Sequence, residues 1–258
     1  MAPLKTFLSR MMSHPLARGR DIDDPETTAL RRRIIRRKPY LQRLYRSWYR
    51  DLAAVLPEGP KPALEVGTGA GFLGQYLPNL ITSDRLHYPG IDLTLDGQHL
   101  PLPKASLRGM VLINVLHHIP HPAHFLQEAG RCVEPGGKLA MIEPWNTPWS
   151  RLIYSHLHHE PFLPDASSWR TPGNGPLSGA NGALPWMIFS RDRGQFEAEC
   201  PSWEIVDIVP HTALQYLCSG GLTYRSLLPG WAFPITQVIE EVLSPWAAMF
   251  ALITLRRT

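Results

Sequence analysis

The chain has 258 residues, of which 44% are hydrophobic, and it carries a formal net charge of +4 at pH 7. This length fits one α/β domain with an insertion, and the apolar content is sufficient for a sizeable core. The mild positive charge permits an anionic partner without requiring one. Three scattered cysteines without metal-ligand spacing favour reduced thiols and a cytoplasmic location. No apolar run is long enough to cross a bilayer, which argues against an integral membrane protein.

Residues 1–56 are predicted to form an irregular arm followed by a basic amphipathic helix over residues 29–55. Arginine and lysine concentrate at positions 31–38, and apolar residues then recur at helical spacing from Leu41 to Leu52. In the simplest interpretation this apolar stripe packs on the domain. In the alternative, the helix covers a ligand or contacts an anionic partner, such as the surface of a membrane.

Residues 63–71, Ala-Leu-Glu-Val-Gly-Thr-Gly-Ala-Gly, read as a short strand that ends in a glycine turn. A helix is expected over residues 72–77, with Pro78 closing it. Glycines let the backbone approach a ligand closely, and a helix start presents free N–H groups. Glu65 lies at the carboxyl end of the strand, where open α/β sheets bind ligands, and its acid suits a ligand with a positive end.

The pattern E-x-G-x-G-x-G resembles motif I of the class I S-adenosylmethionine-dependent methyltransferases, of the methyltransferase type 11-like kind. Residues 69–74 also satisfy G-x-G-x-x-G, the dinucleotide fingerprint, although this pattern starts two residues late after the strand. An unliganded turn is the third interpretation.

The next two predicted strands, residues 80–84 and 90–95, are each closed by an acid. A carboxylate at Asp84 can accept both hydroxyls of a ribose, which supports a nucleoside ligand without choosing between the first two interpretations. Asp96 is followed by Gly-Gln-His-Leu-Pro-Leu-Pro, which resembles the family's "D-a-x-x-L-P-f" segment. That resemblance implies that Asp96 and Gly97 lie beside the adenine amino group.

The fourth predicted strand, residues 110–113, runs into Asn-Val-Leu-His-His-Ile, which resembles the family's "n-V-L-H-H-i". The resemblance places Asn114 beside the methionine part of the cofactor. The Pro-Gly-Gly turn at 135–137, before a fifth strand over 139–143, is also similar to the family. One departure is Leu107-Arg108, where the family often has Phe-Asp.

The resemblance covers roughly residues 60–145 and implies a Rossmann-like seven-stranded sheet with helices on both faces and an antiparallel last strand. It adds an N-terminal helical extension and an inserted cap after strand five. We expect residues 57–258 to form the methyltransferase domain, with 144–200 as the substrate cap. The implied cofactor is S-adenosyl-L-methionine, and its implied binding residues are Glu65, Gly67, Thr68, Gly69, Gly71, Asp84, Asp96, Gly97 and Asn114.

Histidines gather in two runs, at 117–124 and at 156–159. Prolines interrupt the first run and no carboxylate or cysteine completes it, so we expect no metal site. The candidates for a general base are His118, His158, His159 and Glu160. The alternative role for the second run is a polar network that holds the cap.

The predicted function is methyl transfer to a small-molecule or lipid-like acceptor, and the pattern also allows peripheral contact with a membrane. The Asn-Pro-Pro-Tyr type motif is absent and no dedicated nucleic-acid module is present, so a nucleic-acid partner is not expected. The alternatives are an RNA or protein methyltransferase that uses the arginines at 31–37, and a non-catalytic methyltransferase-like scaffold.

Overall fold

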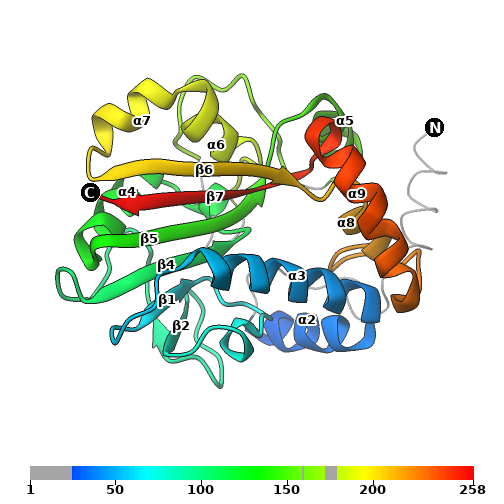
Figure 1. Cartoon of the computed structure of the whole chain (residues 1–258), viewed down its shortest axis with the longest axis horizontal. Coiled ribbons are helices and arrows are strands. Elements are labelled where there is room, and N and C mark those ends of the chain that lie inside the picture. The colour runs from blue at the N-terminus through cyan, green and yellow to red at the C-terminus, as the bar shows by residue number, and fades with distance from the viewer. Residues whose placement is uncertain (1–24, 159, 172–178) are drawn as a thin grey trace.

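The computed structural model describes residues 25–158, 160–171 and 179–258, and a seven-stranded sheet forms its centre (Figure 1). The strands lie in the order β3-β2-β1-β4-β5-β7-β6, and β7 runs antiparallel to both of its neighbours. This topology confirms the Rossmann-like sheet with an antiparallel last strand. The irregular arm predicted for residues 1–24 lies outside the described residues. The strands are β1 Ala63–Val66, β2 Leu80–Asp84, β3 Leu93–Thr94, β4 Leu107–Ile113, β5 Val133–Pro144, β6 Trp203–His211 and β7 Phe250–Arg257.

Helices cover both faces of the sheet, as the resemblance implies. No helix among the described residues is long and apolar enough to cross a membrane. The α-helices are α2 Pro25–Arg37, α3 Pro39–Val55, α4 Pro122–Cys132, α5 Pro148–Leu157, α6 Leu184–Trp186, α7 Arg193–Glu199, α8 Gln215–Ser219 and α9 Phe233–Ala247. Shorter turns are the 3₁₀ helices η2 Leu73–Gln75, η3 Leu116–His118 and η5 Gly230–Ala232, and the π-helical η4 Met187–Arg191.

The single helix predicted over residues 29–55 is two helices, because Lys38 leaves the helical conformation with φ −120° and ψ 85°. Pro39 causes the break, since its ring disfavours a helical conformation at the preceding residue. The apolar stripe of α3 is buried on the domain, as in the simplest interpretation of the sequence. Trp48, at its centre, is 1% exposed and donates its indole N–H to the Thr212 hydroxyl at 3.2 Å.

Two elements next to the glycine turn are shorter than predicted. The helix expected over 72–77 is only the 3₁₀ turn η2, because β2 begins at Leu80 and Pro78 cannot continue a helix. The third strand shrinks to Leu93 and Thr94. The Asp92 carboxylate accepts the backbone N–H and the hydroxyl of Thr82, so a side chain takes the place of further strand pairing.

Arg108 joins the entrance to β1 to the start of β4. Its guanidinium donates to four carbonyl oxygens, those of Pro57, Lys61, Pro78 and Asn79, at 2.8–3.2 Å. The residue is 4% exposed, and burial lowers its pKa. A planar guanidinium presents several donors in fixed directions, which makes it suited to tie converging loop carbonyls together. Arg108, which departs from the family's Phe-Asp pair, therefore acts as a structural clamp.

We predict that Arg108→Met lowers the free energy of unfolding by roughly 1–3 kcal/mol, because four partly buried carbonyl groups would lose a charged donor. Urea denaturation measures this difference. Arg108→Lys keeps the charge without the fork and should recover only part of the loss. An unfolding free energy equal to wild type in Arg108→Met would show that the clamp contributes nothing.

Candidate active site

The candidate site is a cavity of about 470 Å³ beyond the carboxyl ends of β1, β2, β4 and β5. The chain leaves β1 toward β2 on one side, while β4 lies on the other side. Such a switch point is where open α/β sheets form a ligand crevice. All nine residues implied to bind the cofactor line this one cavity, and so do His118, His158 and Glu160. His159, the fourth candidate base, lies outside the described residues.

The glycine turn after β1 forms one wall of the cavity and has little space for side chains. Gly67 and Gly69 have φ values of +72° and +51°, which disfavour other residues. A Cβ at Gly67 would lie 2.5 Å from a methyl of Val115, and a Cβ at Gly71 would lie 2.8 Å from the Tyr49 hydroxyl. The turn therefore depends on glycine for both backbone angle and close packing.

Three N–H groups of this turn are bonded within the protein, which corrects the expectation of a helix start that presents free donors. Gly69 N–H donates to Asp84 Oδ2 at 2.9 Å, Gly71 N–H to the Thr68 carbonyl at 2.9 Å, and Phe72 N–H to the Tyr49 hydroxyl at 3.1 Å. Because η2 is a single 3₁₀ turn, it provides no helix N-terminus for a ligand. The polar groups that this wall offers to the cavity include the carboxylates of Glu65 and Asp84.

Glu65 is the carboxylate at the centre of the wall and is 4% exposed. Its Oε2 accepts the Thr68 hydroxyl at 3.0 Å. Burial raises the pKa of Glu65 to about 7; the bond from Thr68 lowers it, and the nearby Asp84 carboxylate raises it further. The protein alone therefore disfavours negative charge at Glu65, and a cationic group beside it would reverse that preference.

Asp84, at the end of β2, ties the turn to the neighbouring loop. Besides the Gly69 bond, its carboxylate accepts the Leu86 N–H and the Tyr88 hydroxyl, each at 3.2 Å. Its carboxylate oxygens have four lone-pair sites, and these three bonds leave acceptor capacity on the cavity side. The contact between the Tyr88 hydroxyl and Asp84 was not predicted from the sequence. The only sequence signal for it is that Tyr88 follows Asp84 by four residues.

The next carboxylate around the rim is Asp96. Its Oδ1 accepts the backbone N–H of Gln98 at 2.9 Å, and Arg85 lies 3.9 Å from its Oδ2. Asn114, at the end of β4, has a φ of +56° and a backbone N–H bonded to the Ile142 carbonyl. The residues that follow the four predicted strands therefore meet at a single rim.

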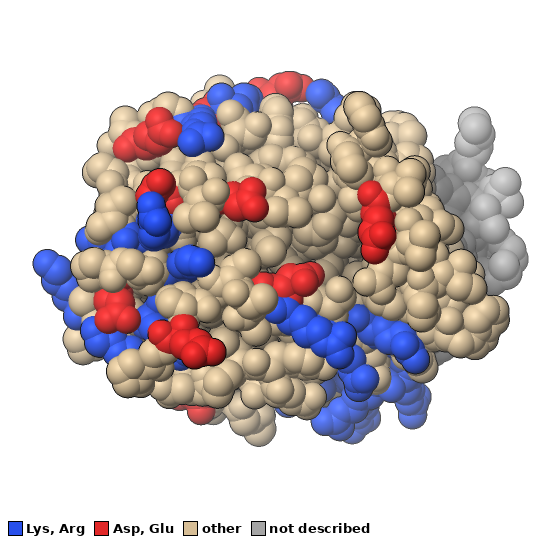
Figure 2. All heavy atoms as spheres, viewed as in Figure 1, with Lys and Arg blue, Asp and Glu red and all other residues tan. Residues whose placement is uncertain are grey.

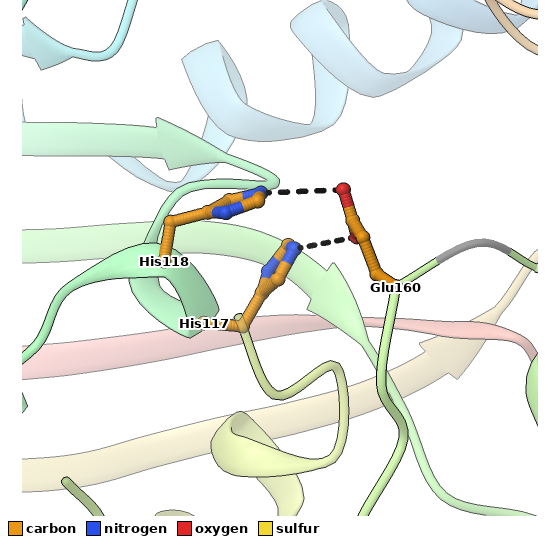
Figure 3. Close-up of side chains that lie close together, drawn as sticks. All are labelled: His117, His118 and Glu160. Atoms are coloured by element: carbon orange, nitrogen blue, oxygen red, sulfur yellow. Dashed lines mark ion pairs between the residues drawn. The ribbon is translucent and has the colours of Figure 1, made fainter. Parts of the chain in front are cut away.

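The opposite end of the cavity is aromatic and polar. The rings that line it include those of Tyr154, Tyr216 and Phe250. Beside them, His117 and His118 project from η3 toward Glu160, which follows α5 (Figure 3). His117 Nε2 lies 3.5 Å from Glu160 Oε2, and His118 Nε2 lies 3.7 Å from Glu160 Oε1.

His117 is held from behind by a carboxylate, Glu143, at the end of β5. Glu143 is fully buried; its Oε2 lies 2.6 Å from His117 Nδ1, while its Oε1 accepts the backbone N–H groups of Val115 and Leu116 at 2.8 Å. Burial opposes charge on His117, but Glu143 and Glu160 outweigh it and raise its pKa to about 9. Burial and the adjacent His117 lower the pKa of His118 to about 4.

Sequence reasoning missed His117 and Glu143 as a pair. The signal was present, since the two residues lie at the ends of neighbouring strands, β4 and β5, at the carboxyl edge of the sheet. The contact between η3 and Glu160 was also not predicted. The two segments are far apart in the sequence, and only the fold brings them together.

Comparison with known proteins agrees with this geometry. The family described as "Methyltransferase domain" matches residues 37–175, which is more than half of the chain. No curated protein sequence matches the chain.

Several solved structures share the fold at low sequence identity. Geranyl diphosphate C-methyltransferase from Streptomyces coelicolor A3(2), in complex with Mg²⁺, geranyl diphosphate and S-adenosyl-L-homocysteine, aligns with 14% identity and a TM-score of 0.53 over 99% of both chains. A methyltransferase in complex with the Trm112 activator from Haloferax volcanii aligns with 13% identity and a TM-score of 0.53, covering 90% of this chain and 94% of that chain. A methyltransferase from Thermotoga maritima aligns with 14% identity and a TM-score of 0.51, covering 88% of this chain and 99% of that chain.

At these identities the structures support the fold alone, and the family match supplies the assignment. That match decides against the dinucleotide interpretation of the glycine turn. Given the family match and the strand order, the chain belongs to the methyltransferase-domain family, within the class I S-adenosylmethionine-dependent methyltransferases.

Proposed function

We propose that the cavity binds S-adenosyl-L-methionine along the β1–β4 rim and that the enzyme transfers the methyl group to a small-molecule or lipid-like acceptor. The observation that carries this proposal is one continuous cavity whose lining includes both the implied cofactor residues and the aromatic, histidine-rich end. The cofactor supplies a methyl group activated by a sulfonium; the carbon–sulfur bond breaks toward sulfur as an acceptor lone pair forms the new bond.

The residues present fit that cofactor. A buried carboxylate with a raised pKa, Glu65, suits the ammonium of the methionine part. Asp84 retains acceptor capacity for the two ribose hydroxyls, and Asp96 with Gly97 lies on the wall where the resemblance puts the adenine. A ligand held at three points along one rim is fixed in orientation, which is the main protein contribution to an in-line displacement.

The acceptor end is supplied by the cap, for which we propose residues 144–200. Tyr154 and Phe162 stack with ring centroids 4.9 Å apart, and Tyr154 donates its hydroxyl to the Met249 carbonyl at 2.9 Å. These contacts hold the cap against the start of β7. An acceptor that must lose a proton would find His118, His158 and Glu160 on the cavity wall.

We further propose that α2 closes the cofactor end, because Arg31, Ile34 and Ile35 line the same cavity. A cytoplasmic location is supported by the free state of Cys132, Cys200 and Cys218. An RNA or protein acceptor is the alternative that the arginines of α2 and α3 would favour. Methyl transfer to RNA with steep salt dependence of binding would support that alternative over a small molecule.

The surface of α9 indicates where a lipid-like acceptor would be met. Its Glu240 faces inward, is 7% exposed and accepts backbone N–H groups of residues 213–215. Its outward face is mostly apolar: Ile235, Val238, Val242 and Trp246 are 60–80% exposed, and the exposed Gln237 and Glu241 are polar exceptions. A helix with its apolar side toward solvent requires a covering partner.

Positive charge lies beside this apolar face. The start of α3 contacts α9 through Tyr40, whose ring lies 5.3 Å from that of Phe233, and α2 ends in the exposed Arg36 and Arg37 just before it. Figure 2 shows blue side chains gathered below the right-hand surface where Figure 1 places α9, and this surface is mostly uncharged apart from one acidic group. Apolar side chains with tryptophan and adjacent arginines fit the interface of an anionic bilayer. We propose that this surface rests on such a membrane.

We predict that the protein cosediments with vesicles containing phosphatidylglycerol and much less with pure phosphatidylcholine. Trp246→Ser and Arg36→Glu should each reduce the bound fraction, because they remove an apolar anchor and an attractive charge. The matched control is Val206→Ser, which changes an exposed apolar residue on β6. This variant should leave the bound fraction unchanged. Equal loss in all three variants, or a stable dimer that buries α9 instead, would contradict the proposal.

We predict that calorimetry will show binding of S-adenosylmethionine and S-adenosylhomocysteine and none of NADH. Asp84→Asn should weaken cofactor binding by about tenfold or more, since a hydrogen bond to a charged group is worth roughly 1.5–3 kcal/mol. The control is Asp165→Asn, which changes a surface carboxylate that is paired with Arg151. If Asp84→Asn binds the cofactor as tightly as wild type, Asp84 is not part of the binding site. If none of the ligands binds, the alternative of a non-catalytic scaffold is favoured.

We also predict that cofactor affinity falls as the pH is lowered from about 8 to about 6. The folded-state pKa of Glu65, about 7, lies above its usual value, so acid protonates the carboxylate that the ammonium needs. Binding near the lower pH should therefore release a proton, which calorimetry in buffers of different ionisation enthalpy detects. Glu65→Gln should bind weakly with this pH dependence removed; if it retained the dependence, another group would be responsible.

A further inference from the structure

The cluster of His117, His118 and Glu160 brings two ring nitrogens and a carboxylate together at the cavity wall. One ligand atom from each residue can be chosen so that the three lie within 4.8 Å of one another. Both Nε2–carboxylate distances, 3.5 and 3.7 Å, exceed the 2.7–2.9 Å that is typical of charge-assisted hydrogen bonds. The spacing therefore leaves more room between these atoms than a shared proton needs.

The orientation of His117 explains which of its nitrogens faces the cluster. Glu143 Oε1 accepts two backbone N–H groups, so this carboxylate acts as an acceptor, and Nδ1 of His117 must supply the proton of the 2.6 Å contact. In the neutral ring, Nε2 then carries a lone pair directed at Glu160. A lone pair and a carboxylate oxygen that face each other need a cation between them, which is either a proton on Nε2 or a metal ion.

The two distances from histidine nitrogens to the Glu160 carboxylate are close to those that a metal ion in that position would give. Bonds of about 2.0–2.2 Å to nitrogen and oxygen in a tetrahedral arrangement place neighbouring ligand atoms roughly 3.3–3.5 Å apart. A carboxylate behind a ligating histidine is the usual outer partner in such sites, since it fixes the ring and its tautomer. His158 is not counted among the ligands, because among the described residues the converging ligand atoms are those of His117, His118 and Glu160.

We propose that His117, His118 and Glu160 bind one divalent transition-metal ion, of the class that includes Zn²⁺ and Fe²⁺. Two imidazoles and one carboxylate favour these ions over Mg²⁺, which prefers oxygen ligands. The expectation of no metal considered the two histidine runs separately, and neither run contains this set. All three ligands line the cavity, so a further coordination position would be open to a ligand bound there.

The consequence for catalysis rests on the proposed function. An ion at this end of the cavity would bind an acceptor through an oxygen atom, such as a hydroxyl, carboxylate or phosphate group. The acceptor class therefore narrows to molecules that offer oxygen ligands next to an apolar part, which the aromatic wall receives.

The test is metal binding by the full-length protein, stripped with a chelator and dialysed against Co²⁺ and Zn²⁺. We expect one equivalent per chain, with visible Co²⁺ absorption bands of the intensity typical of a low-coordinate site. Glu160→Gln and His118→Asn should each weaken binding at least tenfold.

The matched control is His124→Asn, which makes the same chemical change as His118→Asn at a histidine outside the cluster. His124 lies on α4, and its ring stacks on that of His121 with centroids 5.5 Å apart. This variant should bind the metal as tightly as wild type does. Equal weakening in His124→Asn and His118→Asn would place the metal elsewhere and overturn the assignment.

A further variant, at Glu143, distinguishes a metal site from a simple ion-pair network. Glu143→Gln keeps an oxygen for the backbone N–H groups of Val115 and Leu116 but can donate to His117 Nδ1, which moves the ring proton to Nε2. Metal affinity should then fall about 10–100-fold, as it does when an outer carboxylate is lost. Nitrogen-15 spectra of the histidine rings would show the change of tautomer in the metal-free protein.

Absence of stoichiometric metal in wild type, or equal affinity in the wild-type, Glu160→Gln and Glu143→Gln proteins, would also overturn the metal site. Titration of S-adenosylmethionine into the chelator-treated protein keeps the two proposals apart. Cofactor binding without metal binding would refute the site and leave the proposed function standing, whereas metal binding without cofactor binding would do the reverse.

Discussion

The histidine-rich end of the cavity depends on one buried carboxylate, Glu143. With no exposed surface, it accepts the two backbone N–H groups that open η3 and contacts His117 through its other oxygen. A buried carboxylate is stable only when its lone pairs are satisfied, so these three contacts are required together. Their geometry sets the direction of η3, and η3 in turn presents His117 and His118 to Glu160.

The end of the cavity at the glycine turn is built on a different constraint, the shortness of the connection between β1 and β2. Because only a 3₁₀ turn fits there, the glycine turn cannot use a helix N-terminus and is held by Asp84 and by Tyr49 from α3. The N-terminal helices are therefore part of the site's framework. Arg108 acts away from the cavity, where it fixes the loop that leads into β1.

Much of the fold was predictable because local patterns and the parallel sheet agree. The spans of β1 and β2 were predicted correctly, since short apolar runs bounded by glycine, proline and an acid leave little choice. Likewise, the nine implied cofactor residues meet at one rim because parallel strands end at the same edge. Their roles toward the cofactor remain proposals.

What the sequence could not provide depends on contacts between distant segments. The pairing of η3 with Glu160 joins residues that are far apart in the chain, and no local pattern encodes it. The outward apolar face of α9 was also hidden, because a helix pattern reveals a stripe without telling which side faces the core. Here the buried Glu240 decides the side, through backbone groups that lie outside the helix.

The raised pKa of Glu65 links the stability of the protein to its ligand. A carboxyl whose folded pKa of about 7 exceeds its unfolded value contributes stability at low pH that is lost as the pH rises through 7. At neutral and higher pH, the buried negative charge of Glu65 therefore destabilises the ligand-free protein, and a cation bound beside it would offset this cost. A ligand that binds only the folded state adds stability by mass action, so the concentration of cofactor would set the fraction of the chain that is folded as well as the rate of the reaction.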